Sequence, residues 1–208
     1  LNELLSRINM KSLHLNKVGI VLQGMPESSN QATELCEYYN SLGFSNIVIS
    51  SYSEQIDVNK LQEKFKVILN DDKLKHADRD FRRVNTPRGK NQNFQIETTK
   101  KGIEYLKDNT DVEYVLKHRF NDCIIDLDKF VLKWIDSLNS DSGDAPRYFN
   151  KKIIIMGKCG TAAYTCDYWN FGTTIDMWNL WNIPPNTMAH LQAEEYINYC
   201  YLFNKDNI

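Results

Sequence analysis

The sequence predicts a single α/β domain with a mixed, mainly parallel central sheet that is flanked by helices. Short, almost continuously apolar segments alternate with amphipathic ones through the first half of the chain, as buried parallel strands and their crossover helices do. The 208 residues suffice for one sizeable domain but are few for two, and no linker divides them. A hydrophobic content of 42% and a charged content of 25% are ordinary for a globular protein.

The alternation of strands and helices begins at the first apolar run. Residues 18–24 are expected to form a buried strand, and Pro26 lies in the turn after it. Ser28 or Ser29 can cap the next helix, which ends before Gly43. Further strands are expected at residues 46–52, 65–70 and 152–156, and the segment 114–122 is expected to form a strand with a polar end. Further helices are expected at residues 94–106, 127–138, 174–180 and about 187–203.

The composition and the missing motifs exclude several classes of protein. A net charge of −2 gives no general attraction to nucleic acid. The five cysteines are scattered without a C-x-x-C pair, so buried reduced thiols are expected rather than a zinc site or a disulfide framework. No run approaches the roughly 18 apolar residues of a membrane span, and a soluble, cytoplasmic protein is expected. The sequence contains neither a P-loop nor a G-x-G-x-x-G fingerprint, and no G-x-S-x-G motif.

Polar residues follow each of the first four predicted strands. The carboxyl ends of parallel strands meet at one edge of a sheet. Polar groups at all four strand ends therefore indicate a ligand crevice at this edge more than they indicate a chance arrangement. For the first three strands they are Gln23 and Gly24, then Ser50, Ser51, Tyr52 and Ser53, then Asp71 and Asp72 after Asn70. We expect them to line a nucleoside pocket.

The fourth strand ends in a group of residues that suits a diphosphate with a divalent metal ion. Lys117 and Arg119 can neutralise phosphate oxygens, and Asp122 suits a hard cation. His118 can contact phosphate beside them, although a lone histidine on a strand more often has a structural role. Asp126 and Asp128, just beyond, are expected to cap the helix that begins near Leu127.

The long polar segment before residue 94 offers a second set of charges. Asp78 and Asp80 form a D-x-D pair that can hold a metal ion, and Arg79 between them suits phosphate. A solvated surface with aspartate–arginine pairs explains the same residues about equally well. Asn93 and Gln95 follow at a helix start, where free backbone N–H groups favour anions.

Two acidic residues in the second half are candidates for catalysis. Asp167 lies among tyrosine, tryptophan and phenylalanine residues, whose rings can stack on sugars, and its carboxylate can act as a general base on a hydroxyl. An aromatic core with a capping aspartate is the alternative. Glu194 can point toward the crevice, although a solvated helix face is the more common role for such a residue.

Together these motifs resemble the WavE-type lipopolysaccharide-synthesis glycosyltransferases, which are nucleotide-sugar enzymes of the GT-A fold. They also resemble the glycosyltransferase domain of a large chlorovirus protein, for which a host-cytoplasmic location would be expected. The matching segments are residues 18–24, 93–103, 114–119, 167–172, 177–181 and 193–196. The family usually brings the acid after Lys-x-Arg one residue earlier than Asp122, so Asn121, Asp78 or Asp80 can share metal binding here.

The resemblance implies one GT-A-like (Rossmann-like) domain, with a nucleotide-binding half at about residues 17–126 and an acceptor-side half at about 127–208. It also implies a diphosphate bridged by Mn²⁺ or Mg²⁺. We expect metal-dependent transfer of a hexosyl or deoxyhexosyl group from a UDP-sugar donor to a glycan hydroxyl. A sugar nucleotidyltransferase and a non-catalytic glycan-binding domain remain alternatives. Further domains of a longer chain are compatible with each of these three functions.

Overall fold

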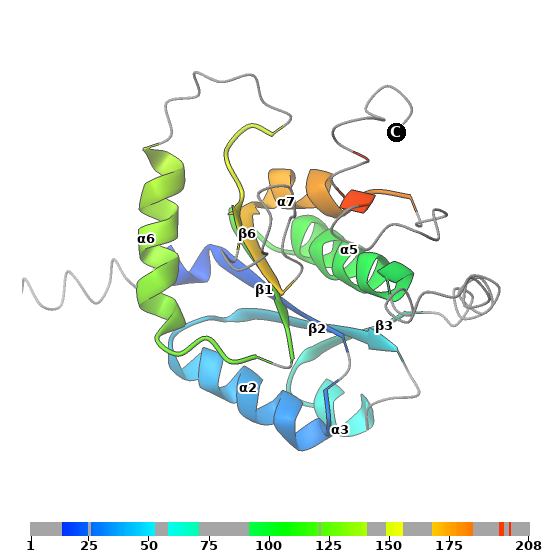
Figure 1. The fold of residues 1–208 in the computed structure, drawn as a ribbon. Coiled ribbons are helices and arrows are strands. Elements are labelled where there is room, and N and C mark those ends of the chain that lie inside the picture. Colours follow the sequence, from blue (N-terminus) through cyan, green and yellow to red (C-terminus); the bar gives the residue numbers. More distant parts are fainter. Residues whose placement is uncertain are drawn as a thin grey trace, which may run out of the picture.

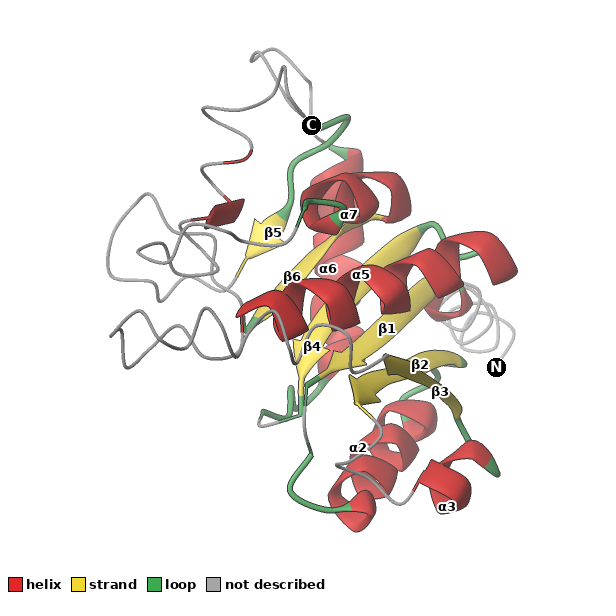
Figure 2. Ribbon diagram, turned by 90° about the vertical axis from the view of Figure 1, so that its right-hand side faces the viewer, coloured by secondary structure: helices red, strands yellow, loops and turns green. Residues whose placement is uncertain are grey.

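In the computed structural model, a six-stranded mixed sheet lies between two groups of helices (Figures 1 and 2). The structure describes residues 14–24, 26–52, 58–70, 92–120, 122–140, 149–155, 168–184, 196, 197 and 200. The strand order is β3-β2-β1-β4-β6-β5. The predicted α/β class with a mainly parallel central sheet is therefore confirmed.

Four neighbouring strands are parallel and two are not. The parallel strands are β1 (Val18–Gln23), β2 (Asn46–Tyr52), β3 (Lys66–Asn70) and β4 (Tyr114–Arg119). Strand β6 (Trp169–Thr173) runs antiparallel to β4, and the short β5 (Ile154–Ile155) pairs antiparallel with β6. All six residues of β1 are buried, as expected for a central strand that is covered on both faces.

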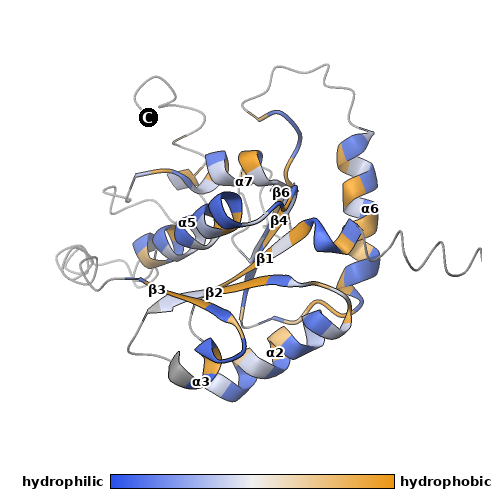
Figure 3. Cartoon of the chain, turned by 180° about the vertical axis from the view of Figure 1, so that it is seen from behind, coloured by the Kyte–Doolittle hydropathy of each residue, from blue (hydrophilic) through white to orange (hydrophobic). Residues whose placement is uncertain are grey.

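The helices divide between the two faces of the sheet. Helices α2 (Ser29–Ser41), α3 (Val58–Gln62) and α6 (Leu127–Asn139) pack on one face. Helices α5 (Gln92–Asn109) and α7 (Thr174–Trp181) pack on the other. In Figure 3, α6 carries bands of apolar and polar residues, because one of its sides is buried and the other is exposed.

Side chains of β1 alternate between the two cores. Ile20 and Leu22 join the core beneath α2 and α6, whereas Val21 joins the core beneath α5 and α7. On the second face, α5 lies directly on β1. A Cβ atom on Gly102 of α5 would lie 2.4 Å from Val21 Cγ1, so this close approach requires glycine.

The ends of the helices bear out some of the capping predictions and correct others. Ser28 caps α2, since its hydroxyl accepts a hydrogen bond from the Gln31 N–H at 3.1 Å, and Gly43 follows the helix with φ of 107°. Asp126 occupies the N-cap position of α6 without making a side-chain cap bond. Its carboxylate instead lies 3.0 Å from the Lys129 ammonium, and Asp128 is buried in the first turn.

Several predicted elements differ from those observed. The helix expected at 94–106 spans Gln92–Asn109, and the strand expected at 152–156 is reduced to Ile154–Ile155. The sequence did not predict α3, nor did it predict that Trp169–Thr173 forms a strand. Most of the final predicted helix lies outside the described residues, although residues 196, 197 and 200 are helical.

Candidate functional site

The topology marks one place on the sheet as a natural ligand site. From β1 the chain proceeds to β2 and β3 on one side, whereas β4 pairs with the other side of β1. The carboxyl ends of β1 and β4 therefore form the switch point of the sheet, where ligands of open α/β proteins bind. Gln23 stands at this point, in register with Ser50 of β2 and Arg119 of β4.

A row of buried polar side chains crosses this carboxyl edge on the face that α5 covers. Asn70 of β3 donates hydrogen bonds to the Ser50 hydroxyl at 3.1 Å and to the Ser51 carbonyl at 3.0 Å. Ser50 is 0% exposed, and Asn70 and Gln23 are each 6% exposed. Gln23 Oε1 accepts no hydrogen bond from the part of the chain that the structure describes. A buried acceptor of this kind calls for a water or a ligand donor.

Two basic side chains of β4 extend this row. Lys117 is fully buried, with its ammonium 5.1 Å from the centre of the Trp181 ring of α7. Arg119 is half-buried at the strand end, with its guanidinium carbon 4.9 Å from the centre of the Tyr168 ring. Both distances suit cation–π attraction. The charge of Lys117 therefore lies between the sheet and α7, and that of Arg119 lies at the switch point.

His118 points to the opposite face of the sheet. Its ring meets the Tyr39 ring of α2 edge-on, with centroids 6.0 Å apart, and it is fully buried. Burial, with a smaller effect from the charge of Lys117, lowers the His118 pKa from 6.5 to about 3. The imidazole is therefore neutral near pH 7. This geometry favours the structural role that the sequence left open for His118, because a neutral buried ring brings no positive charge to a phosphate.

Asp122 follows the end of β4 in an exposed position. Among the described residues, no group of three or more histidine, cysteine, aspartate or glutamate side chains is arranged to hold a metal ion. A cation bridged to a diphosphate needs only one or two protein carboxylates, because phosphate oxygens and water complete its shell. Asp122 alone therefore still fits the role of a single carboxylate ligand.

The start of α5 lies over the same edge of the sheet. Gly102 of α5 faces Val21, and Leu106 faces Gly19 near the start of β1, so the preceding turns of α5 lie toward the carboxyl ends of the strands. Asn93 and Gln95 in its first turn are 5% and 6% exposed, and both are engaged in interactions. The sequence predicts that these two residues lie near the ligand, and the structure places them toward the carboxyl edge of the sheet.

Several predicted site residues lie outside the described part of the chain. They are Ser53, Asp71, Asp72, Asp78, Arg79, Asp80, Asn121, Asp167 and Glu194. Tyr52 ends β2 through its backbone, and Gly24 follows β1 with φ of 101°. Gly24 thus has the left-handed conformation that favours glycine, directly at the switch point.

Sequence reasoning missed two contributors to the site. Tyr168 was counted only among the aromatic neighbours of Asp167, yet its ring packs on Arg119. Asn70 was expected among the polar strand ends, but its hydrogen bond to Ser50 was not predicted. Both contacts depend on which strands become neighbours, so the pairing register is the signal that would have revealed them.

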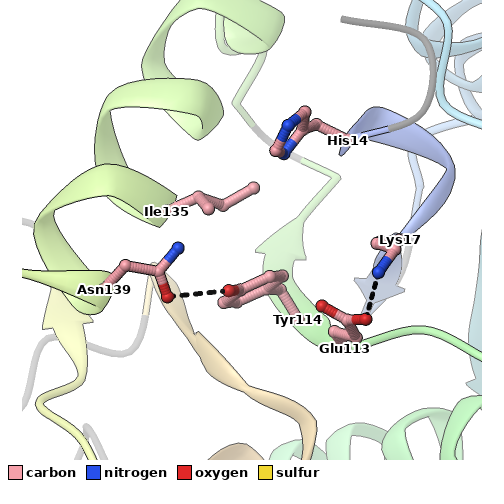
Figure 4. Close-up of a pocket in the computed structure, with 6 residues that line it drawn as sticks. All are labelled: His14, Lys17, Glu113, Tyr114, Ile135 and Asn139. Carbon is pink, nitrogen blue, oxygen red and sulfur yellow. Dashed lines mark hydrogen bonds and ion pairs between the residues drawn. The ribbon is translucent and has the colours of Figure 1, made fainter. Parts of the chain in front are cut away.

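A small hollow of about 140 Å³ lies at the opposite edge of the sheet (Figure 4). It is lined by His14, Lys17, Glu113, Tyr114, Ile135 and Asn139. Lys17 and Glu113 form an ion pair there, and the Tyr114 hydroxyl donates to Asn139 Oδ1 at 3.2 Å. Because this hollow is at the amino ends of β1 and β4, it is separate from the switch point.

Comparisons with known proteins add no family assignment. No protein-family model matches this chain, and no curated protein sequence matches it significantly. Among the helices that the structure describes, none combines the length and the apolarity that a membrane crossing requires.

Proposed function

We propose that this chain is a glycosyltransferase of the GT-A kind that binds a nucleoside diphosphate sugar at the carboxyl edge of its sheet. One observation carries the proposal. The buried polar row of Asn70, Ser50 and Gln23 meets the basic residues Lys117 and Arg119 at the switch point between β1 and β4. Amide and hydroxyl groups suit a nucleoside, and adjacent cations suit its diphosphate.

The charges at this edge support transfer rather than binding alone. When a glycosyl group leaves a nucleoside diphosphate, negative charge grows on the departing phosphate oxygens, and fixed cations stabilise it. We propose that Arg119 does this at the switch point and that the buried Lys117 adds positive charge. A bound Mn²⁺ or Mg²⁺ would neutralise the same oxygens, with Asp122, Asp78 and Asp80 as its proposed ligands.

The remaining parts of the proposal concern the acceptor. Asp167 or Glu194 is proposed to take the proton from a glycan hydroxyl as it attacks the donor sugar. UDP is the proposed nucleotide, and the transferred group is proposed to be a hexose or deoxyhexose. A cytoplasmic location and membership of a longer chain belong to the same proposal.

The first experiment measures thermal stabilisation by UDP with and without Mn²⁺. A ligand that binds only the folded protein stabilises it by about 2.7 kcal/mol at a hundred times its dissociation constant. We expect UDP with Mn²⁺ to raise the melting temperature of the wild type. Arg119→Gln should lose most of this rise, while the control Lys64→Gln should keep it, because Lys64 pairs with Glu37 on the exposed surface of the protein.

The second experiment measures hydrolysis of UDP-sugars, with and without Mn²⁺, in the wild type, Asp122→Ala and Asp78→Ala. Unchanged turnover in both variants would exclude the proposed metal ligands. Release of pyrophosphate from UTP and a sugar phosphate would identify a nucleotidyltransferase instead. Binding of glycans without any nucleotide effect would identify a glycan-binding domain.

A further inference from the structure

Two consecutive tyrosines of α2 contact the loop that joins β4 to α6. The Ile124 N–H donates a hydrogen bond to the Tyr39 hydroxyl oxygen at 3.1 Å, and the Asp126 N–H donates to the Tyr38 hydroxyl oxygen at 3.1 Å. Figure 1 shows this loop passing beside α2 on its way to α6. The loop begins after Phe120 and carries Asp122.

The anchor for these bonds is rigid. Tyr39 is fully buried, and its ring meets those of Phe44 and His118 edge-on, with centroids 6.4 Å and 6.0 Å apart. Tyr38 packs beside it, with ring centroids 5.6 Å apart. Burial raises the pKa of Tyr39 well above its usual value, so its hydroxyl keeps its proton across the physiological pH range.

Ile124 packs against the core beneath α2, whereas the other described residues of the loop are exposed. Asp122 and Cys123 are exposed, and Ile125 is 72% exposed. Asp126 has φ of 54°, a left-handed conformation that costs free energy in a residue other than glycine. The tyrosine bonds therefore act on a segment that includes one strained residue and in which, among the described residues 122–126, Ile124 alone packs against the core.

We propose that Tyr38 and Tyr39 are positioning residues that hold the 122–126 loop, and with it Asp122, at the carboxyl edge of β4. This inference rests on the proposed function, since Asp122 is there a ligand of the catalytic metal ion. A ligand that is already held in its bound position does not have to be ordered when the metal ion binds, so this restraint strengthens metal binding. Two hydrogen bonds from tyrosines of α2, of which Tyr39 is fully buried, restrain this loop.

The test compares the double variant Tyr38→Phe/Tyr39→Phe with Tyr114→Phe as a matched control. The control also removes one tyrosine hydrogen bond, to Asn139, but at the opposite end of β4. The first readout is hydrogen exchange of the Ile124 and Asp126 amides. Loss of one hydrogen bond shifts a local opening equilibrium by about fivefold, so both amides should exchange at least several-fold faster in the double variant.

The second readout is UDP-sugar hydrolysis as a function of Mn²⁺ concentration. We expect the double variant to need several-fold more Mn²⁺ for half-maximal activity, with kcat at saturating Mn²⁺ close to that of the wild type. The control should match the wild type in both readouts. Should the double variant fail to fold, Tyr38→Phe alone gives the same comparison, because Tyr38 is less buried than Tyr39.

Two results would overturn the inference. Unchanged amide exchange would show that the tyrosines do not hold the loop, and faster exchange with an unchanged Mn²⁺ requirement would show that Asp122 does not depend on them. A wild type that hydrolyses no donor would instead overturn the proposed function. The exchange readout needs no activity, so it would still decide whether the tyrosines hold the loop.

Discussion

The buried His118 should make the protein less stable as the pH falls, and His118→Leu should remove that effect. The folded protein holds the imidazole neutral, because burial lowers its pKa from 6.5 to about 3. In the unfolded chain the ring is solvated and takes up a proton below about pH 6.5. Acid therefore favours the unfolded state, and the stability present above about pH 6.5 is lost progressively as the pH approaches 3.

The size of the effect follows from the two pKa values. At pH 5, which is about 1.5 pH units below the pKa of the solvated ring, protonation of His118 stabilises the unfolded state. The folded state binds almost no proton at this ring, because its pKa there is about 3. At about 1.36 kcal/mol per pH unit, the unfolded state is stabilised relative to the folded state by about 2 kcal/mol. Between pH 7.5 and pH 5, the free energy of unfolding of His118→Leu should therefore fall by about 2 kcal/mol less than that of the wild type.

Urea unfolding at the two pH values measures this difference, followed by fluorescence of the tryptophans. Val131→Ala is the control, because it removes packing from the same core and leaves His118 in place. We expect it to be less stable at both pH values and to keep the pH dependence of the wild type. An equal loss of stability between pH 7.5 and pH 5 in His118→Leu and the wild type would refute the argument.

Four further substitutions test the packing and the helix ends by urea unfolding. Gly102→Ala should lower the free energy of unfolding by about 1–3 kcal/mol despite the helix propensity of alanine, because the new Cβ would lie 2.4 Å from Val21 Cγ1. A stabilised variant would contradict this close approach. Asp176→Asn should lower the free energy of unfolding by about 3 kcal/mol, since the buried carboxylate accepts hydrogen bonds from two backbone N–H groups and a hydroxyl at 2.7–2.9 Å. An unchanged free energy of unfolding would mean that these hydrogen bonds are not made. Ser28→Ala should cost about 1 kcal/mol and Ser29→Ala less, and the reverse order would place the cap of α2 at Ser29.

The parts of the fold that the sequence predicts well are those whose burial repeats locally. Strand β1 is buried on both faces, and its apolar run predicts it almost to the residue. Strand β6 was not predicted, because its burial depends on contacts with other elements and not on a repeating local pattern. Phe171 stacks on Tyr114 of β4 with centroids 5.8 Å apart, and Gly172 packs against Met177 of α7. The contact between Phe171 and Tyr114 is tertiary, so a five-residue segment rich in aromatic residues gives no periodic signal of it.

The convergence of the strand ends was predicted from the sequence, whereas the directions of the side chains at this edge were not. Parallel strand order places Gln23 beside Arg119, as the convergence of strand ends implies. Lys117, His118 and Arg119 were expected to act together, although alternate residues of a strand face opposite sides of the sheet. That alternation puts His118 beside Tyr39 and Lys117 beside Trp181. The complete burial of both side chains depends on helices that come from distant parts of the sequence.

The position of β1 at the centre of the sheet has a consequence for how the protein is made. Its β2 side can pair early, but its other side waits for β4, which follows α2, β2, α3, β3 and α5 along the chain. Until then, the apolar sequence VGIVLQ presents an open strand edge on a ribosome-bound or refolding chain. Synthesis that stalls before residue 114 should therefore give the most aggregation-prone nascent chains, and chaperones that cover exposed strands should act mainly in that interval.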